Sequence, residues 1–100
     1  MVSFSRGAAA REVDLTTPGL LRAARALAQV DAVQLAEAAN VGVITIKRIE
    51  SGKAAGLRAA THASIAEALL ALGVELLPSE AKRGPGLRLV ERQDAASRPI

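Results

Sequence analysis

Residues that begin or end helices divide positions 17–73 of this sequence into short segments. The start signals are Thr17 followed by Pro18, Asp31 followed three residues later by Gln34, and Thr61; the stop signals are Asn40, Ser51 with Gly52, and Gly73. Hydroxyl and carboxylate side chains cap helix N-termini, and proline fits the first helical position. Asparagine and glycine accept the left-handed backbone that ends a helix. This spacing predicts a chain of four short helices.

Apolar residues recur within these segments at the three- and four-residue spacing of amphipathic helices. We expect the core to bury Leu20, Leu21, Ala24, Leu27 and Ala28 of the first helix, Leu35, Ala36 and Ala39 of the second, and Ile65, Ala68, Leu69 and Leu72 of the fourth. Phe4 is the one aromatic residue, so the core must be aliphatic. One hundred residues suit a single domain, and its predicted fold class is mainly α.

The segment VGVITIKRIESG, residues 41–52, is where local propensity and periodicity disagree. Its β-branched run favours a strand, but the alternation of a strand fails at the charged residues. Read as a helix that begins after Gly42, the segment places Ile46 and Ile49 three residues apart on one face. Each β-branched residue costs a helix only roughly a few tenths of a kcal/mol. The periodicity therefore predicts a third helix.

The regions outside the helical part have a different character. Residues 1–16 show no sustained period and are predicted to form a flexible arm. Residues 74–91 hold two short alternating runs, 74–77 and 87–90, which predict a β-hairpin or two strands that pair elsewhere. A lone hairpin is marginal, so we expect it to pack on the helices, to form part of a homodimer, or both. Residues 92–100 are predicted to be a polar tail.

The formal net charge of +3 lies in the middle of the chain. From Leu20 to Ala60 there are six basic and three acidic residues, so the two flanks together are neutral. A local basic excess suits either an anionic partner or a solvated surface. The chain has no cysteine, which excludes disulfides and suits the reducing cytoplasm. No apolar run resembles a signal peptide or reaches the length of a membrane span, so no membrane partner is expected.

The sequence gives no indication of catalysis. His62 is the single histidine and, without cysteines, a poor candidate for a metal ligand. His62, Ser64 and Glu67 fall within one or two turns of a single helix, with no oxyanion donors nearby, so they do not suggest a catalytic set. The glycines of RGPGLRLV lack the lysine and hydroxyl residue of a phosphate-binding loop. We therefore predict that the protein is not an enzyme and uses no cofactor or metal.

The middle of the chain resembles a known family. The family pattern is matched by Leu35-Ala36, Asn40-Val41-Gly42, Thr45-Ile46, Ile49-Glu50 and Gly52, all in register. These residues are similar to those of the Xre/Cro-type helix-turn-helix regulators, which share the phage-repressor DNA-binding fold. The resemblance covers roughly residues 18–73. It implies a four-helix repressor-like domain with a short C-terminal β-hairpin or strand pair.

The resemblance also assigns roles to individual residues. Arg25 of the first helix and Glu50 of the third would form a structural salt bridge, and helix 42–50 would enter the major groove of DNA. Candidate base contacts are Val43, Ile44, Lys47 and Arg48; candidate phosphate contacts are Gln34, Thr45, Lys53 and Arg58. Two positions depart from the family: Gly42 replaces a capping serine, and Ala32 replaces a phosphate-binding glutamine. Both departures predict weaker anchoring to the DNA backbone.

The physical chemistry of the third helix agrees with these roles. If Ile46 and Ile49 face the core, Val43, Ile44, Lys47 and Arg48 face outward. Lys47 and Arg48 can donate to guanine or to phosphate. Val43 and Ile44 can contact thymine methyl groups, pack on a neighbouring helix, or bind a partner protein. The primary hypothesis is a sequence-specific transcriptional regulator that binds double-stranded DNA as a homodimer. The alternative is a protein-binding module, such as an antitoxin or a polymerase adaptor.

Overall fold

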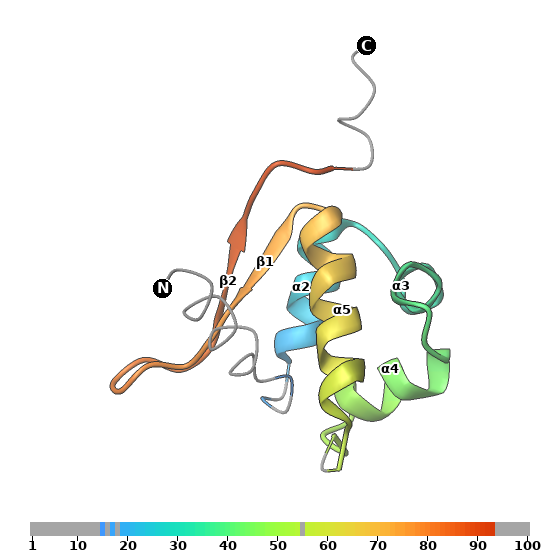
Figure 1. Ribbon diagram of the computed structural model, residues 1–100, viewed down its shortest axis with the longest axis horizontal. Coiled ribbons are helices and arrows are strands. Elements are labelled where there is room, and N and C mark those ends of the chain that lie inside the picture. The colour runs from blue at the N-terminus through green and yellow to red at the C-terminus, as the bar shows by residue number, and fades with distance from the viewer. Residues whose placement is uncertain (1–14, 16, 18, 55, 94–100) are drawn as a thin grey trace.

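The computed structural model describes residue 15, residue 17 and residues 19–54 and 56–93. Over these residues the protein is mainly helical and carries a small two-stranded antiparallel sheet (Figure 1). The helices are α2 (Leu20–Ala28), α3 (Ala32–Ala39), α4 (Val43–Glu50) and α5 (Ala59–Ala71), and the strands are β1 (Val74–Leu77) and β2 (Gly86–Leu89). The predicted mainly α class is confirmed, and the strand-like segment 41–52 contains a helix.

Local side-chain chemistry sets the ends of α3 and α4. The carboxylate of Asp31 accepts the backbone N–H of Gln34 at 2.7 Å, and the Gln34 side chain accepts the backbone N–H of Asp31 at 2.8 Å. This reciprocal capping box satisfies two N–H groups that the helix itself leaves unpaired. Asn40 ends α3 with φ 58°, and Gly52 follows α4 with φ 82°. These predicted helix boundaries are confirmed.

The predicted starts of α2 and α5 are wrong. Leu20 is the first residue of α2, because Gly19 at φ 83° turns the backbone away from the helix; Pro18 lies outside the described residues. The first residue of α5 is Ala59, and Thr61 lies inside its first turn, where its N–H donates to the Arg58 carbonyl at 3.0 Å. The two alanines before Thr61 are strong helix formers and extend the helix backwards.

Aliphatic side chains from every helix and from β1 form one core. Its largest fully buried members are Leu15, Leu21, Leu35, Ile46, Ile49, Ile65, Leu69 and Val74. Leu15 corrects the boundary of the predicted arm, because its side chain is completely buried. Two predicted core residues are less buried than expected: Leu72 is half-buried, and Leu27 is 45% exposed. The buried face of α2 is centred on Ala24 and Ala28, which leaves Leu27 at its margin.

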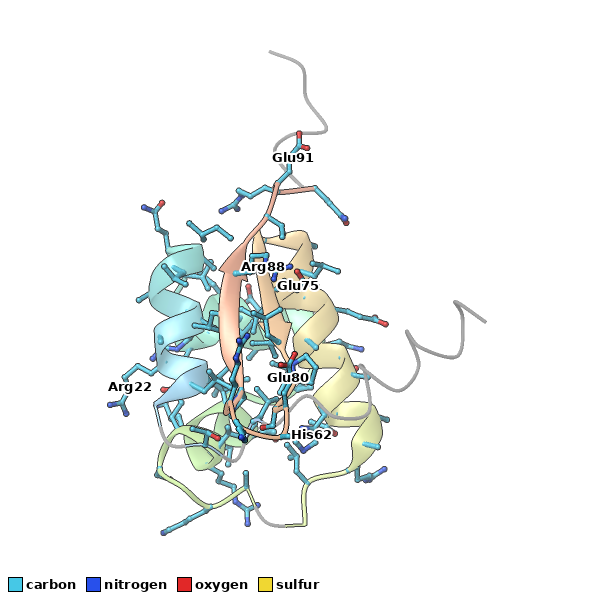
Figure 2. All side chains as sticks on the ribbon, turned by 90° about the vertical axis from the view of Figure 1, so that its left-hand side faces the viewer. Arg22, His62, Glu75, Glu80, Arg88 and Glu91 are labelled. Carbon is cyan, nitrogen blue, oxygen red and sulfur yellow. The ribbon has the colours of Figure 1, made fainter. Side chains whose placement is uncertain are left out.

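The predicted hairpin is present. Strand β1 pairs with β2 in the register Val74↔Leu89, Glu75↔Arg88, Leu76↔Leu87 and Leu77↔Gly86, so β2 begins one residue earlier than predicted. Val74 and Leu76 are buried, and Leu87 packs against the same core. Glu75 and Arg88 lie side by side near the middle of the sheet (Figure 2) and form an ion pair at 3.6 Å.

The chain beyond β2 remains attached to the helices as far as the structure describes it. The N–H of Val90 donates to Gly73 and that of Gln93 donates to Ala71, both at 2.8 Å. The Arg92 guanidinium donates to the Ala28 carbonyl at 3.4 Å. Residues 92 and 93, predicted to belong to a polar tail, therefore pack on the domain; residues 94–100 lie outside the described part.

Gly73 is the tightest point of this arrangement. Its φ is 99°, and a Cβ built there would lie 2.9 Å from the Arg92 Cγ and 3.1 Å from the Val90 carbonyl oxygen. We expect Gly73→Ala to lower the free energy of unfolding by about 1–3 kcal/mol, since a left-handed backbone is costly for alanine. Urea denaturation measures this change. Gly84→Ala is the matched control, because a Cβ there meets nothing within 4 Å. Equal effects at both positions would contradict the argument.

Candidate nucleic-acid interface

Helix α4 is anchored by one face and exposed on the other. Ile46 is 0% exposed and Ile49 is 2% exposed, so both side chains hold the helix to the core. Lys47 and Arg48 are exposed, and Ile44 is 66% exposed. The division of faces predicted from the sequence is confirmed for these residues. Val43 is the exception, because it is half-buried and packs against the core, so the expectation that it faces outward is wrong.

A partly buried ion pair joins α4 to α2. The Arg25 guanidinium donates through Nε to Glu50 Oε2 at 2.7 Å and through a terminal nitrogen to Glu50 Oε1 at 2.9 Å. The Glu50 side chain is 8% exposed and that of Arg25 is 19% exposed. The predicted pair is therefore present in the bidentate geometry that suits arginine and carboxylate. It fixes the last turn of α4 relative to α2.

The contacts of Arg25 favour the charged form of its guanidinium. The hydrogen bond to Glu50 raises the pKa of the Arg25 guanidinium above its ordinary value, and burial opposes this shift. A further N–H donates to the Val30 carbonyl at 3.4 Å, beyond the end of α2. Because the guanidinium donates to both α4 and the turn after α2, it ties the last turn of α4 to α2 and to that turn.

Arg22 is a functional candidate that the sequence reasoning missed. It lies one turn before Arg25 on α2, and its Nε is 3.8 Å from Glu50 Oε1. Its side chain is 67% exposed, so most of its donors remain accessible to solvent. The three-residue spacing from Arg25 is the signal that could have found it, because such residues share a helix face. Arg22 therefore adds a cation beside the C-terminal end of α4.

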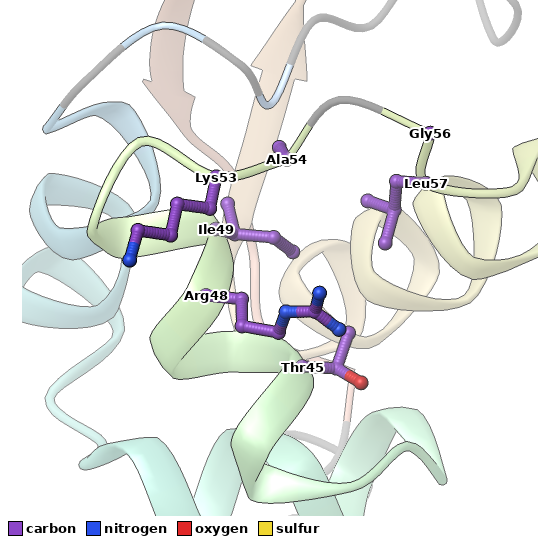
Figure 3. Close-up of a pocket in the computed structure, with 7 residues that line it drawn as sticks. All are labelled: Thr45, Arg48, Ile49, Lys53, Ala54, Gly56 and Leu57. Atoms are coloured by element: carbon purple, nitrogen blue, oxygen red, sulfur yellow. The ribbon is translucent and has the colours of Figure 1, made fainter.

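A small pocket lies where α4 meets the following loop. Its volume is about 150 Å³, and it is lined by Thr45, Arg48, Ile49, Lys53, Ala54, Gly56 and Leu57 (Figure 3). Figure 3 shows the Arg48 side chain extending towards Thr45. The structure thus brings together three predicted DNA-contacting residues, Thr45, Arg48 and Lys53. Two of them are cationic, and the rest of the lining contributes no carboxylate.

The remaining predicted phosphate contacts lie outside this pocket. Arg58 is exposed and precedes the first turn of α5, which has no side-chain cap. Gln34 is exposed on α3, but its side-chain oxygen already accepts the Asp31 N–H. Within the described chain, no carboxylate forms an ion pair with Lys47, Arg48, Lys53 or Arg58. These cations are available to an external anion.

The described part of the chain contains no group of three or more His, Asp or Glu side chains that could hold a metal ion. None of its helices combines the length and the apolar character that crossing a membrane requires. Comparisons with protein-family models, with curated proteins and with solved structures found no match to this chain. The surface of α4 and its surroundings is therefore the feature of the molecule that indicates a function.

Proposed function

We propose that the protein is a sequence-specific DNA-binding transcriptional regulator in which α3, the turn at residues 40–42 and α4 form a helix-turn-helix. The observation that carries this proposal is the exposed face of α4. It presents Ile44, Lys47 and Arg48 outward, while the buried Ile46 and Ile49 and the Arg25–Glu50 pair hold the helix rigid. A short, firmly anchored helix with outward cations is suited to insertion in a major groove.

The three outward residues suit different features of a base pair. The planar guanidinium of Arg48 can bond to guanine O6 and N7 together, which the Lys47 ammonium does with less directional selectivity. Ile44 cannot hydrogen-bond, but it can pack on a thymine methyl group. Val43 packs on the core and is therefore not proposed as a base contact. The proposed readout thus combines polar and apolar contacts within the exposed face of α4.

The surroundings of α4 supply backbone contacts. Lys53 and Arg58 are exposed and carry charges that can neutralise phosphates. Neither α4 nor α5 has a side-chain cap, so the N–H groups that precede Thr45 in α4 and Thr61 in α5 can donate to an anion. These contacts offset the loss of the serine and glutamine that Gly42 and Ala32 replace in the resembling family. They fix the domain on the duplex without reading its sequence.

Two copies of the domain would read a pseudo-palindrome, with the α4 helices in successive major grooves about 34 Å apart. Selection of bound duplexes from a random pool tests the function, with binding measured afterwards by gel shift at moderate salt. We expect a two-fold-related consensus that the protein binds about 10³-fold or more tightly than random duplex. Recovery of no consensus, with equal binding of all duplexes, would overturn the assignment.

A protein-binding module is the second candidate, and the exposure of Ile44 favours it. An apolar side chain that is 66% exposed at the start of α4 can enter a pocket on another protein. In that case α3 and α4 act as a scaffold, as in an antitoxin or a polymerase adaptor. Failure to select DNA, together with a tight protein complex that Ile44→Lys abolishes, would favour this function.

A further inference from the structure

The pocket beside α4 has an apolar floor and a polar rim. The floor consists of Ile49, Ala54 and Leu57: the first two are 2% and 4% exposed, and Leu57 packs against the core. The rim includes Thr45, which is half-buried, and Arg48, which is exposed. A mostly apolar lining with a few polar groups is the usual composition of a small-molecule site.

The polar groups of the rim converge and lack partners. Figure 3 shows the Arg48 side chain reaching towards Thr45, while the Lys53 side chain extends the other way. Within the part of the chain that the structure describes, neither the Thr45 hydroxyl nor the Arg48 guanidinium forms a hydrogen bond or an ion pair. Glu50, the acidic residue of α4, is held by Arg25. A hydroxyl donor and a planar guanidinium are therefore free to bind one anion.

Hydrogen bonds fix the walls of the pocket. The N–H of Lys53 and the hydroxyl of Ser51 both donate to the Arg48 carbonyl, at 2.9 Å and 3.1 Å. The N–H of Leu57 donates to the Ala54 carbonyl at 3.0 Å and closes the next turn. The loop is thus held against the end of α4 before any ligand arrives, which lowers the ordering cost of binding.

We propose that this pocket binds a small organic monocarboxylate whose apolar group is about the size of a benzene ring. The pocket volume of about 150 Å³ matches that of protein cavities that hold benzene. The carboxylate accepts two hydrogen bonds from the fork of Arg48 and one from the Thr45 hydroxyl, and the apolar group covers the floor. A phosphate, free or in DNA, has no apolar part to cover that floor, which favours an organic acid.

Such a ligand regulates DNA binding by competing for Arg48. This step rests on the proposed function, in which the same guanidinium bonds to a guanine. One guanidinium fork cannot hold both a carboxylate and a guanine edge, so the acid and the DNA exclude each other. The apparent dissociation constant for DNA then rises by the factor 1 + [L]/Kd of the acid. The acid is therefore an effector that releases the protein from its duplex.

Titration of the full chain with sodium benzoate tests the pocket, followed by two-dimensional NMR of the backbone amides at constant ionic strength without DNA. We expect saturable shifts at the pocket residues, with a dissociation constant of about 1 mM or lower. Benzyl alcohol keeps the ring without the charge, and inorganic phosphate keeps the charge without the ring; both should bind at least about tenfold more weakly. No saturable shift with benzoate would refute the proposal, as would equally tight binding of either comparison compound.

Two substitutions test the rim. Arg48→Met removes the charge and should raise the dissociation constant for benzoate at least about tenfold; Thr45→Val removes the hydroxyl and should raise it about threefold. Lys82→Met is the control, because it removes one positive charge from the exposed hairpin loop, and it should change the constant less than about twofold. Equal effects of Arg48→Met and Lys82→Met would show that Arg48 does not hold the ligand.

Competition with the selected duplex tests the regulatory step. With benzoate at ten times its dissociation constant, we expect the dissociation constant for the duplex to rise about tenfold at constant ionic strength. An unchanged affinity for the duplex would contradict the competition. Failures of the two proposals are distinguishable: benzoate binding without a selected duplex refutes the DNA-binding function and leaves the pocket standing. A selected duplex without benzoate binding does the reverse.

Discussion

Replacing Arg25 by alanine is expected to lower the free energy of unfolding by about 3–5 kcal/mol, because Glu50 is then left charged and buried without its partner. The Glu50 carboxylate is 8% exposed and receives two hydrogen bonds from Arg25 at 2.7 and 2.9 Å. Arg22, at 3.8 Å and 67% exposed, is too far and too solvated to replace them. Urea denaturation followed by far-ultraviolet circular dichroism measures the loss.

Two further variants separate the ion pair from general damage to α2. Arg22→Ala removes an exposed cation near the same carboxylate and should cost less than about 1 kcal/mol. The double variant Arg25→Met with Glu50→Leu removes both charges and should recover much of the stability, since paired apolar replacements are often tolerated. If Arg25→Ala leaves the unfolding midpoint unchanged, the pair does not stabilise the end of α4.

Both ends of α3 and of α4 were predicted correctly from the sequence, whereas the starts of α2 and α5 were not. The capping box of Asp31 with Gln34 and the left-handed Asn40 and Gly52 depend on residues within a few positions of one another. Their chemistry is local, so a pattern of neighbouring residues determines it. The long-range Arg25–Glu50 pair was also predicted, but by resemblance to a family, because its members lie 25 positions apart in the sequence.

The errors concern burial, which depends on what each residue meets across the fold. Val43 occupies the first turn of α4 and was assigned outward by helix periodicity, but the adjoining core reaches it. Leu15 has no periodic neighbours and was assigned to the arm, although the core closes over it. Leu27 follows the apolar spacing of α2 and is nevertheless 45% exposed. For Val43 and Leu15 the decisive contact comes from the core, and for Leu27 the expected contact is missing; periodicity within one segment reveals neither.

The observed burial of these residues narrows the set of side chains that α4 presents to a partner. With Val43 in the core, Ile44 is the single apolar residue on the outward face of α4, flanked along the helix by Lys47 and Arg48. The Gln34 side-chain oxygen is engaged in the capping box, which fixes the orientation of the amide and leaves its NH2 group as the donor for a phosphate. The assignment of Thr45, Arg48 and Lys53 as DNA contacts is strengthened, because all three line one pocket. The proposed interface is thus centred on the C-terminal half of α4 and the loop that follows.

Substituting Arg48 is the most direct probe of that interface. If Arg48 bonds to a guanine, we expect Arg48→Glu to weaken binding to the selected duplex by more than about 100-fold, because a guanine contact worth about 1–3 kcal/mol is lost and a carboxylate faces the phosphates. Arg83→Glu, an equal charge reversal in the exposed hairpin loop, is the control. Gel shift or fluorescence anisotropy at constant salt measures both variants.

The pattern of loss distinguishes base readout from general attraction. Arg48→Ala should relax the preference at one base position of the consensus, whereas Lys53→Ala should weaken binding to all duplexes alike and reduce the slope of log K against log salt by about one. The difference follows from their places in the structure, because Arg48 lies on the helix that would enter the groove and Lys53 lies on the loop beyond it. If Arg48→Ala weakens every sequence equally, Arg48 contacts phosphate, and the specificity of α4 must come from Lys47 and Ile44.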